Sequence, residues 1–276
     1  MLNGYRTDLD YKENHLMKSR FEYKVILITG AASGLGPAGA QHVANEGAKL
    51  SLVDLNEEGL KETEKLIKSE VPDAEILLIT ADVSKEEDVK NYVNQTVDKF
   101  GEIDGFFNNV GIEGKQNLTE VYTSEEFEKV VSINLNGVFF GMKHVLKVMK
   151  EQGEGSIVNT ASVGGIRGVG NQSGYSATKH DVVGLTRNSA VEYEQFGVNI
   201  NAIAPGAIMT AIVEGSSKQM DPENWEEACK EFISVNPMKR FGTTEEVGSL
   251  AAFLLSESGF INGAVINIDG GQSYKY

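Results

Sequence analysis

A short apolar run that leads directly into a glycine-rich turn constrains the fold of this chain more than any other feature. Residues 24–29 read K-V-I-L-I-T, residues 30–36 read G-A-A-S-G-L-G, and a helix-like stretch follows that ends at Gly47. Uninterrupted apolar runs of this length are typical of strands in parallel sheets that are covered on both faces. The order of strand, turn and helix predicts an α/β domain that begins with a phosphate site.

The glycines of this turn have the spacing that a pyrophosphate needs. Gly30 and Gly34 allow a tight turn and close approach of the backbone, and Gly36 opens the helix, whose free amide groups attract negative charge. Pro37 is predicted at the first helical position, where an amide has no intrahelical partner. The predicted phosphate contacts are Gly30, Ser33, Gly34, Leu35 and Gly36.

The next apolar run, residues 49–53, ends in Asp54, which stands 24 residues after Gly30. A carboxylate at this point accepts hydrogen bonds from the ribose hydroxyls of a dinucleotide and repels a 2′-phosphate. Neither Pro37 nor Leu55 supplies a cation that would offset this repulsion. We therefore expect NAD(H), bound by Asp54 and Leu55, rather than NADP(H). The alternative is that Asp54 only caps the helix that follows it.

Further apolar runs alternate with helix-like stretches through the rest of the chain. About seven strands are expected, and alternation of this kind predicts an α/β fold with one Rossmann-type doubly wound parallel sheet. Residues 1–22 are polar and lack periodicity, so we expect a flexible N-terminal extension before a single domain at residues 23–276. The expected later strands are 75–83, 103–111, 156–160, 198–204 and 264–268.

Polar or small residues follow several of these strands, at the edge where open α/β sheets bind ligands. Asn108 and Asn109 are expected to bind backbone groups and hold neighbouring strands in register, although an ordinary loop is the alternative. Gly111 allows the chain to pass close to a ligand. The predicted cofactor contacts at these strand ends are Asp82, Val83, Asn109, Gly111, Pro205, Gly206, Ile208 and Thr210.

Residues 162–179 place a hydroxyl, a phenol and an ammonium group in one short span. Tyr175 and Lys179 are four residues apart in a helix-like stretch, so their side chains share a face. A nearby ammonium favours the phenolate and is predicted to lower the tyrosine pKa from about 10. Ser162, across a glycine-rich turn, is predicted to hold a substrate carbonyl beside the phenol. The alternative is an ordinary, partly buried tyrosine near a surface lysine.

A long helix is expected over residues 124–150, and its apolar pattern is interrupted by Asn134, which needs a hydrogen-bond partner if it is buried. Small residues on this helix and on the helix that begins at Tyr175 would admit a second helix at close range. We expect these helices to form the subunit interface of a homo-oligomer, a tetramer. The small residues are Gly137, Gly141, Ala177, Gly184, Ser189 and Ala190.

Apolar side chains also occur after the strand at 198–204, separated by E-G-S-S-K-Q. We interpret residues 207–238 as a mobile lid over the substrate.

Composition excludes several classes of protein. The net charge of −15 disfavours nucleic acid and anionic membranes as partners. The first residues lack the apolar core of a signal peptide, and a single cysteine, Cys229, fits a reducing compartment, so we expect a cytoplasmic protein. The four histidines show no metal-ligand spacing, and no metal is expected.

Taken together, these motifs resemble the short-chain dehydrogenase/reductase family over residues 24–271. The resemblance implies that Tyr175 is the acid/base, that Ser162 fixes the carbonyl and that Asn134 holds a water of the proton relay. It also implies that Lys179 lowers the phenol pKa and binds the nicotinamide ribose. Val110, where the family has Ala, is a departure. The matching motifs are T-G-x-x-x-G-x-G at 29–36, D-V at 82–83, N-N-x-G at 108–111, Asn134, Ser162, Y-x-x-x-K at 175–179 and P-G at 205–206.

Within the family, the stretches at the expected pocket are most similar to an NAD(H)-dependent reductase of a substituted cyclohexanedione. This similarity implies a small-molecule substrate that is a cyclic or hydrophobic ketone or its alcohol. A sugar, hydroxysteroid or 3-oxoacyl reductase is the alternative within the family. A non-catalytic dinucleotide-binding regulator is the alternative outside it, but such a protein usually lacks the Tyr or the Lys. The implied substrate contacts are Ser162, Gly164, Ile166, Gln172 and Met209.

Overall fold

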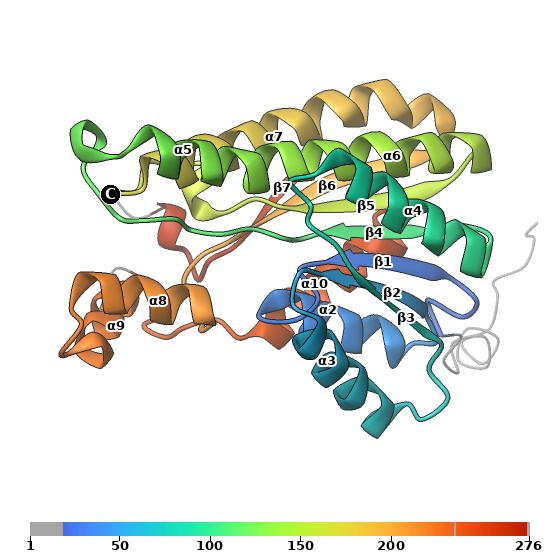
Figure 1. Ribbon diagram of the computed structural model, residues 1–276, viewed down its shortest axis with the longest axis horizontal. Helices are drawn as coiled ribbons and strands as arrows, with labels where there is room; N and C mark the ends of the chain where they lie inside the picture. The colour runs from blue at the N-terminus through green and yellow to red at the C-terminus, as the bar shows by residue number, and fades with distance from the viewer. Residues whose placement is uncertain (1–18, 235, 275–276) are drawn as a thin grey trace, which may run out of the picture.

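Seven parallel strands form one sheet in the order β3-β2-β1-β4-β5-β6-β7 in the computed structural model of the chain, which describes residues 19–234 and 236–274 (Figure 1). This order confirms the predicted doubly wound sheet. The strands are β1 Val25–Thr29, β2 Lys49–Asp54, β3 Ile76–Thr80, β4 Gly105–Asn108, β5 Gly155–Thr160, β6 Val198–Pro205 and β7 Val265–Ile268.

Helices cover both faces of the sheet. On one face lie α2, α3 and α10, and on the other lie α4, α6 and α7 (Figure 1). All five residues of β1 are buried, which confirms the reading of the first apolar run. The helices are α2 Leu35–Ala44, α3 Glu57–Glu70, α4 Glu86–Phe100, α5 Ser124–Val131, α6 Gly137–Gln152, α7 Ser173–Tyr193, α8 Ala211–Met220, α9 Trp225–Ser234 and α10 Thr244–Glu257.

Two helices differ in detail from the predictions. Helix α2 begins at Leu35, so Pro37 is its third residue rather than its first. That position is still in the first turn, where amides have no intrahelical acceptor, so proline is tolerated there. The long helix expected over 124–150 is interrupted by one turn of π-helix, Ser132–Asn136, between α5 and α6. This wider turn contains Asn134, and π-turns of this kind often occur at functional sites.

The predicted N-terminal boundary also needs correction. Residues 1–18 of the expected extension lie outside the described residues, but residues 19–22 pack on the domain. Phe21 is 1% exposed in the core beside α2, its amide donates to the carbonyl of Glu46, and Arg20 forms an ion pair with Glu46. Residues 19–22 are therefore part of the folded domain and not of a flexible extension.

The glycines of α6 do not face a partner subunit. A Cβ atom on Gly137 would lie 2.9 Å from Val83, and one on Gly141 would lie 2.9 Å from Phe106. Both glycines are therefore needed for close packing of α6 within its own chain. The part of the interface prediction that rests on these two residues is wrong.

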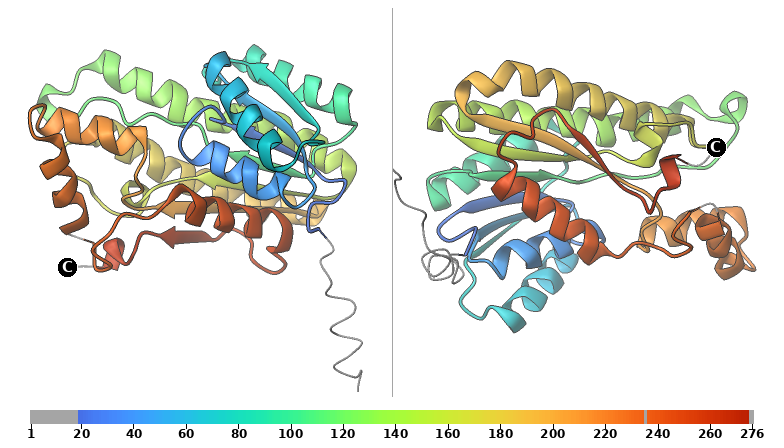
Figure 2. Two further views of the ribbon diagram at one scale, coloured as in Figure 1. Left: turned by 90° about the horizontal axis from the view of Figure 1, so that it is seen from below. Right: turned by 180° about the vertical axis from the view of Figure 1, so that it is seen from behind.

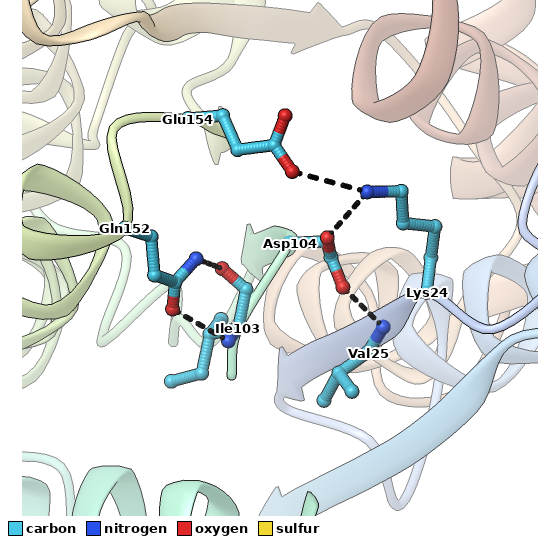
Figure 3. Close-up of polar contacts among 6 residues, drawn as sticks. All are labelled: Lys24, Val25, Ile103, Asp104, Gln152 and Glu154. Carbon is cyan, nitrogen blue, oxygen red and sulfur yellow. Dashed lines mark hydrogen bonds and ion pairs between the residues drawn. The ribbon is translucent and has the colours of Figure 1, made fainter. Parts of the chain in front are cut away.

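Polar contacts fasten the amino-terminal edge of the sheet, at the end opposite to the carboxyl ends of the strands (Figure 3). The Asp104 carboxylate accepts from the Val25 amide and from the Lys24 ammonium group, both at 2.7 Å. Glu154 lies 3.3 Å from the same ammonium, and the Gln152 side chain bonds both the amide and the carbonyl of Ile103. These contacts tie the starts of β1 and β4 to the end of α6.

Asp104→Ala is expected to lower the free energy of unfolding by about 2–3 kcal/mol, because a backbone amide and an ammonium group lose a charged acceptor. Urea denaturation measures this change, and turnover per folded molecule should stay at the wild-type value. The control is Glu154→Ala, which removes the exposed partner of the same lysine and should cost no more than about 1 kcal/mol. An equal loss of unfolding free energy in the two variants would contradict the larger stabilising role that we assign to Asp104.

Candidate active site

A single pocket of about 430 Å³ lies at the carboxyl ends of the strands and brings the predicted site residues together. It extends from the glycine-rich turn after β1, past the ends of β2 to β6, to α8. Of the predicted residues, those that line it are Gly30, Ser33, Gly34, Leu35, Asp54, Leu55, Asp82, Val83, Asn109, Gly111, Ser162, Gly164, Gln172, Tyr175, Lys179, Pro205, Gly206, Ile208 and Thr210.

The glycine-rich turn has the backbone geometry that the sequence predicts. Gly30 and Gly34 both have a φ of +67°, which favours glycine. Gly36 is buried and does not line the pocket, so its predicted direct contact with phosphate is not what the structure shows. A Cβ atom on Gly36 would lie 2.0 Å from the carbonyl oxygen of Gly30. Gly36 therefore allows α2 to begin directly beneath the turn.

Asp54 does not cap the helix that follows it, and its carboxylate instead bonds two backbone amides at the edge of the pocket. One carboxylate oxygen accepts from the Ala32 amide of the glycine-rich turn at 3.1 Å, and the other accepts from the Asn56 amide at 2.9 Å. The cap of α3 itself is the side chain of Asn56, which accepts from Gly59. Asp54 thus supports the turn and lines the pocket, next to Leu55, which is 68% exposed.

Asp82 and Val83 line the same end of the pocket, beyond β3. The Asp82 carboxylate accepts from the Ser84 hydroxyl at 2.6 Å and from the Ser84 amide at 3.0 Å. The Ser84 hydroxyl, acting against partial burial, holds the pKa of Asp82 below its ordinary value. Asp82 is therefore a charged, fixed acceptor at this end.

The two asparagines after β4 hold neighbouring elements in register, as predicted. Asn109 donates to the carbonyl of Thr29 at 3.2 Å and accepts from the Thr160 hydroxyl at 3.1 Å, so it links β1 to β5. Asn108 donates to the carbonyl of Val138 in α6 and to the side chain of Asn159. These buried bonds position the segment at 109–113, which borders the pocket.

Ser162, Tyr175 and Lys179 meet in the middle of the pocket. Helix α7 places Tyr175 in its first turn and Lys179 one turn later, with the lysine Nζ 5.6 Å from the centre of the tyrosine ring. Lys179 donates to the carbonyl of Thr160 at 2.7 Å. The Ser162 hydroxyl accepts from the Gly164 amide at 3.1 Å and hydrogen-bonds Tyr175. The predicted hydroxyl, phenol and ammonium group therefore share one pocket.

The prediction that the pKa of Tyr175 lies below its ordinary value is wrong. Burial raises the pKa of Tyr175 to about 12, although the hydrogen bond from Ser162 opposes this, and the Glu113 carboxylate raises it further. Burial also lowers the pKa of Lys179 to about 8. Burial dominates because both side chains are withdrawn from water. The phenol is thus held in its protonated form at neutral pH.

Asn134 lies behind the pocket rather than in its wall. It is fully buried in the π-turn, donates to the carbonyl of Ile112 at 2.7 Å and accepts from the Ile112 amide at 2.8 Å. Both backbone groups of Ile112 are thereby fixed. A Cβ atom on the neighbouring Gly111 would lie 3.2 Å from the Lys179 Nζ. Asn134 therefore positions a segment that passes close to Lys179.

Two of the implied substrate contacts do not line the pocket. Ile166 packs against the core beside α7, and the Met209 side chain is 46% exposed. The pocket is also lined by residues outside the predicted set, among them apolar side chains, one hydroxyl and one carboxylate. The carboxylate, Glu113, follows β4 by five residues, and that strand end is its signal in the sequence. These unpredicted lining residues include Ile112, Glu113, Val169, Ile212, Val213 and Ser216.

Within residues 19–234 and 236–274 no group of acidic, histidine and cysteine side chains could hold a metal ion. In the same part of the chain, no helix has both the length and the apolar character to cross a bilayer.

Comparison with known proteins identifies the family. A family model described as enoyl-(acyl carrier protein) reductase matches residues 30–273. Levodione reductase of Leifsonia aquatica is 61% identical over 94% of this chain and 97% of that protein. Cyclohexanol dehydrogenase of Acinetobacter sp. (strain SE19) is 37% identical over 94% and 99%.

Solved structures agree with these matches. The crystal structure of levodione reductase has a TM-score of 0.92 over 93% of this chain and 100% of that chain, at 61% identity. NAD+-bound xylitol dehydrogenase has a TM-score of 0.86 over 91% and 99%, at 33% identity. Since the family model matches residues 30–273 and levodione reductase is 61% identical over 94% of the chain, the chain belongs to the short-chain dehydrogenase/reductase family and is an oxidoreductase of CH–OH and C=O groups.

Proposed function

We propose that this enzyme transfers a hydride between NAD(H) and a cyclic or hydrophobic ketone or its alcohol, with a levodione-like cyclohexanedione as the leading substrate class. The observation that carries the proposal is the meeting of Ser162, Tyr175 and Lys179 in one pocket with the glycine-rich turn. Both tyrosine and lysine line the pocket, which argues against a non-catalytic regulator.

The described residues suit a dinucleotide along the whole pocket. The turn at Gly30 and Gly34 leaves its backbone open to a pyrophosphate, and Asp54 presents a carboxylate to a ribose. Lys179, Pro205 and Gly206 also line the pocket, and we propose that they border the nicotinamide and its ribose. NAD(H), when bound, supplies or accepts the hydride.

Each catalytic side chain has a role that follows from its contacts. Tyr175 donates a proton to the carbonyl oxygen during reduction, which its raised pKa permits because the phenol stays protonated at neutral pH. Ser162 holds the carbonyl oxygen beside that phenol. Lys179, held by the Thr160 carbonyl, supplies positive charge near the phenolate that forms. Asn134 positions the 111–112 backbone, and we retain for it the role of holding a relay water.

The walls of the substrate end favour an apolar ring. Ile112, Val169, Ile212 and Val213 line it, and polar groups are contributed by Gln172 and Glu113. Levodione reductase and cyclohexanol dehydrogenase are both similar to this chain over most of its length. A sugar, hydroxysteroid or 3-oxoacyl reductase is the alternative. NADH consumption with cyclic diketones, hydroxysteroids, sugars and acyl thioesters tests the choice, and preference for an acyl thioester or a sugar would overturn it.

Asp54→Asn is expected to raise the ratio of kcat/KM for NADPH to that for NADH by about tenfold, equivalent to about 1.4 kcal/mol. Asparagine keeps one oxygen that can accept from the Ala32 amide of the turn, loses the acceptor of the Asn56 amide, and removes the charge that repels a 2′-phosphate. Initial rates with both cofactors at one ketone concentration measure the ratio. An unchanged ratio would mean that this carboxylate does not select NAD(H).

We further propose that residues 207–238 form a lid over the substrate, and α8 and α9 are the helices that the structure describes in it.

We also propose a homotetramer in the cytoplasm, with the outer surface of α7 in the subunit interface. Ala177 and Gly184 are exposed there, and Val191 is 81% exposed. Light scattering after size-exclusion chromatography should give four times the chain mass of 30.0 kDa. A stable monomer at micromolar concentration would contradict the interface.

A further inference from the structure

A half-buried carboxylate that the proposed chemistry does not use joins three parts of the pocket wall. Glu113 lies in the segment after β4, and one of its oxygens, Oε1, accepts three hydrogen bonds. The Ser216 hydroxyl of α8 donates at 2.9 Å, the Gln116 amide group donates at 3.2 Å, and the Gln172 amide group at the start of α7 also donates. Ser216 is 1% exposed, so its bond to Glu113 is shielded from water.

A second set of hydrogen bonds joins α8 to the segment that follows Glu113. The side chain of Gln219, one turn after Ser216 in α8, accepts from the backbone amide of Gln116 at 3.0 Å and donates to the carbonyl of Gly114 at 3.4 Å. The Gln116 side chain also donates to the Ser216 hydroxyl. Helix α8 is therefore joined to the segment at 113–116 by a continuous set of polar bonds.

No apolar side chain of α8 belongs to the two core clusters that the described residues form. The helix packs on α9, and the two helices stand apart from the sheet and its covering layers (Figures 1 and 2). The side chains of Ile212 and Met220 are 44% and 48% exposed. At its amino-terminal base the lid is pinned by a backbone bridge between Ile208 and Gly242. The far end of α8 thus depends on hydrogen bonds, which can exchange with water when a segment opens.

We propose that Glu113 is a positioning residue that latches α8 over the substrate pocket, with Ser216 as its counterpart on the lid. Binding and release of substrate then require the Glu113–Ser216 bond to break and α8 to pivot about the bridge at Ile208. A charged acceptor makes the latch stronger than a bond between neutral groups. The substrate that the latch admits rests on the proposed function, but the latch itself does not.

The chain offers a matched control one residue away. Ser217 is also a buried hydroxyl in α8, but it donates to the carbonyl of Val213 and contacts the sulfur of Cys229, so it serves packing within the lid. Ser216→Ala and Ser217→Ala remove the same atom from the same helix. They differ because the Ser216 hydroxyl bonds Glu113, outside the lid, whereas the Ser217 hydroxyl bonds only residues within the lid.

Hydrogen exchange of the NAD-saturated enzyme tests the latch without any ketone. Ser216→Ala and Glu113→Ala should each speed exchange about tenfold or more, since a lost bond to a charged group has that weight. The effect should appear both in α8 and in residues 112–117. The double variant should exchange much more slowly than the product of the two single effects, because the Glu113–Ser216 bond is lost in each single variant. Ser216→Thr, which keeps the hydroxyl, should restore slow exchange.

Ser217→Ala should leave residues 112–117 at the wild-type exchange rate. The latch is overturned if Ser216→Ala leaves both segments unchanged, if the two single effects add in the double variant, or if Ser217→Ala releases residues 112–117 equally. Trp225, the only tryptophan of the chain, lies in α9 and offers a second readout of lid motion by fluorescence. Because neither readout needs turnover, a wrong substrate assignment and a wrong latch give different results.

Discussion

Tyr175→Phe is expected to lower the turnover number by about 10²–10⁴-fold, the usual contribution of a positioned general acid. Phenylalanine keeps the ring that packs beside Lys179 and removes only the hydroxyl that bonds Ser162. NADH should therefore bind with nearly unchanged affinity. Ketone-dependent NADH oxidation measures the first quantity, and fluorescence titration with NADH measures the second.

Tyr122→Phe is the matched control for this experiment. Its hydroxyl is also buried, has no hydrogen-bond partner among the described residues, and lies beside Gly174 at the start of α7. Removing a hydroxyl that makes no bond costs little, so turnover should stay near the wild-type value. Loss of activity in both variants would point to a general disturbance of α7, and comparable turnover in Tyr175→Phe would remove the phenol from the reaction.

Gly36→Val is expected to raise the Kd for NADH by about fivefold to 150-fold, because overpacking costs about 1–3 kcal/mol and about 1.4 kcal/mol is a factor of ten. A Cβ atom there would lie 2.0 Å from a backbone oxygen of Gly30, which cannot move without changing the phosphate turn. Isothermal titration with NADH measures the loss, and thermal melting should show a lower midpoint.

Gly168→Ala provides the control for added volume at a glycine. No atom lies within 4 Å of a Cβ atom built on Gly168, although this residue also belongs to a glycine-rich loop near the pocket. Its NADH affinity should therefore remain within about twofold of wild type, a difference of about 0.4 kcal/mol. If Gly36→Val bound NADH as tightly as Gly168→Ala, close packing beneath the turn would not be needed for cofactor binding.

Local patterns predicted the fold correctly, and most of the predicted cofactor contacts line one pocket. The apolar run at β1, the glycines that follow it and the alternation of later strands with helices were sufficient to predict the parallel sheet and the ligand edge. Nearly every predicted cofactor contact lines the pocket. These features are visible in the sequence because they depend on backbone geometry and side-chain periodicity over a few neighbouring residues.

The residues whose positions differ from the predictions are placed by contacts between segments that are distant in the sequence. Ile166 and Met209 were assigned to the substrate on local likeness, but packing turns one toward the core and exposes the other. Glu113 carries no motif, and its importance arises from Gln172 and Ser216, which are 59 and 103 residues away in the chain. Gly137 and Gly141 match the pattern of a subunit interface, but the side chains that pack against them, Val83 and Phe106, are distant in the sequence.

The sequence by itself determined which chemical groups are present and in what order they follow the strands, since strand, turn and helix propensities act over short spans. Tertiary structure alone decided the electrostatic state of those groups and how the lid is held. Burial by the whole fold raises the pKa of Tyr175 to about 12 and lowers that of Lys179 to about 8. The physical reason is that removal from water depends on every segment that packs around a side chain, and no short stretch of sequence contains that information.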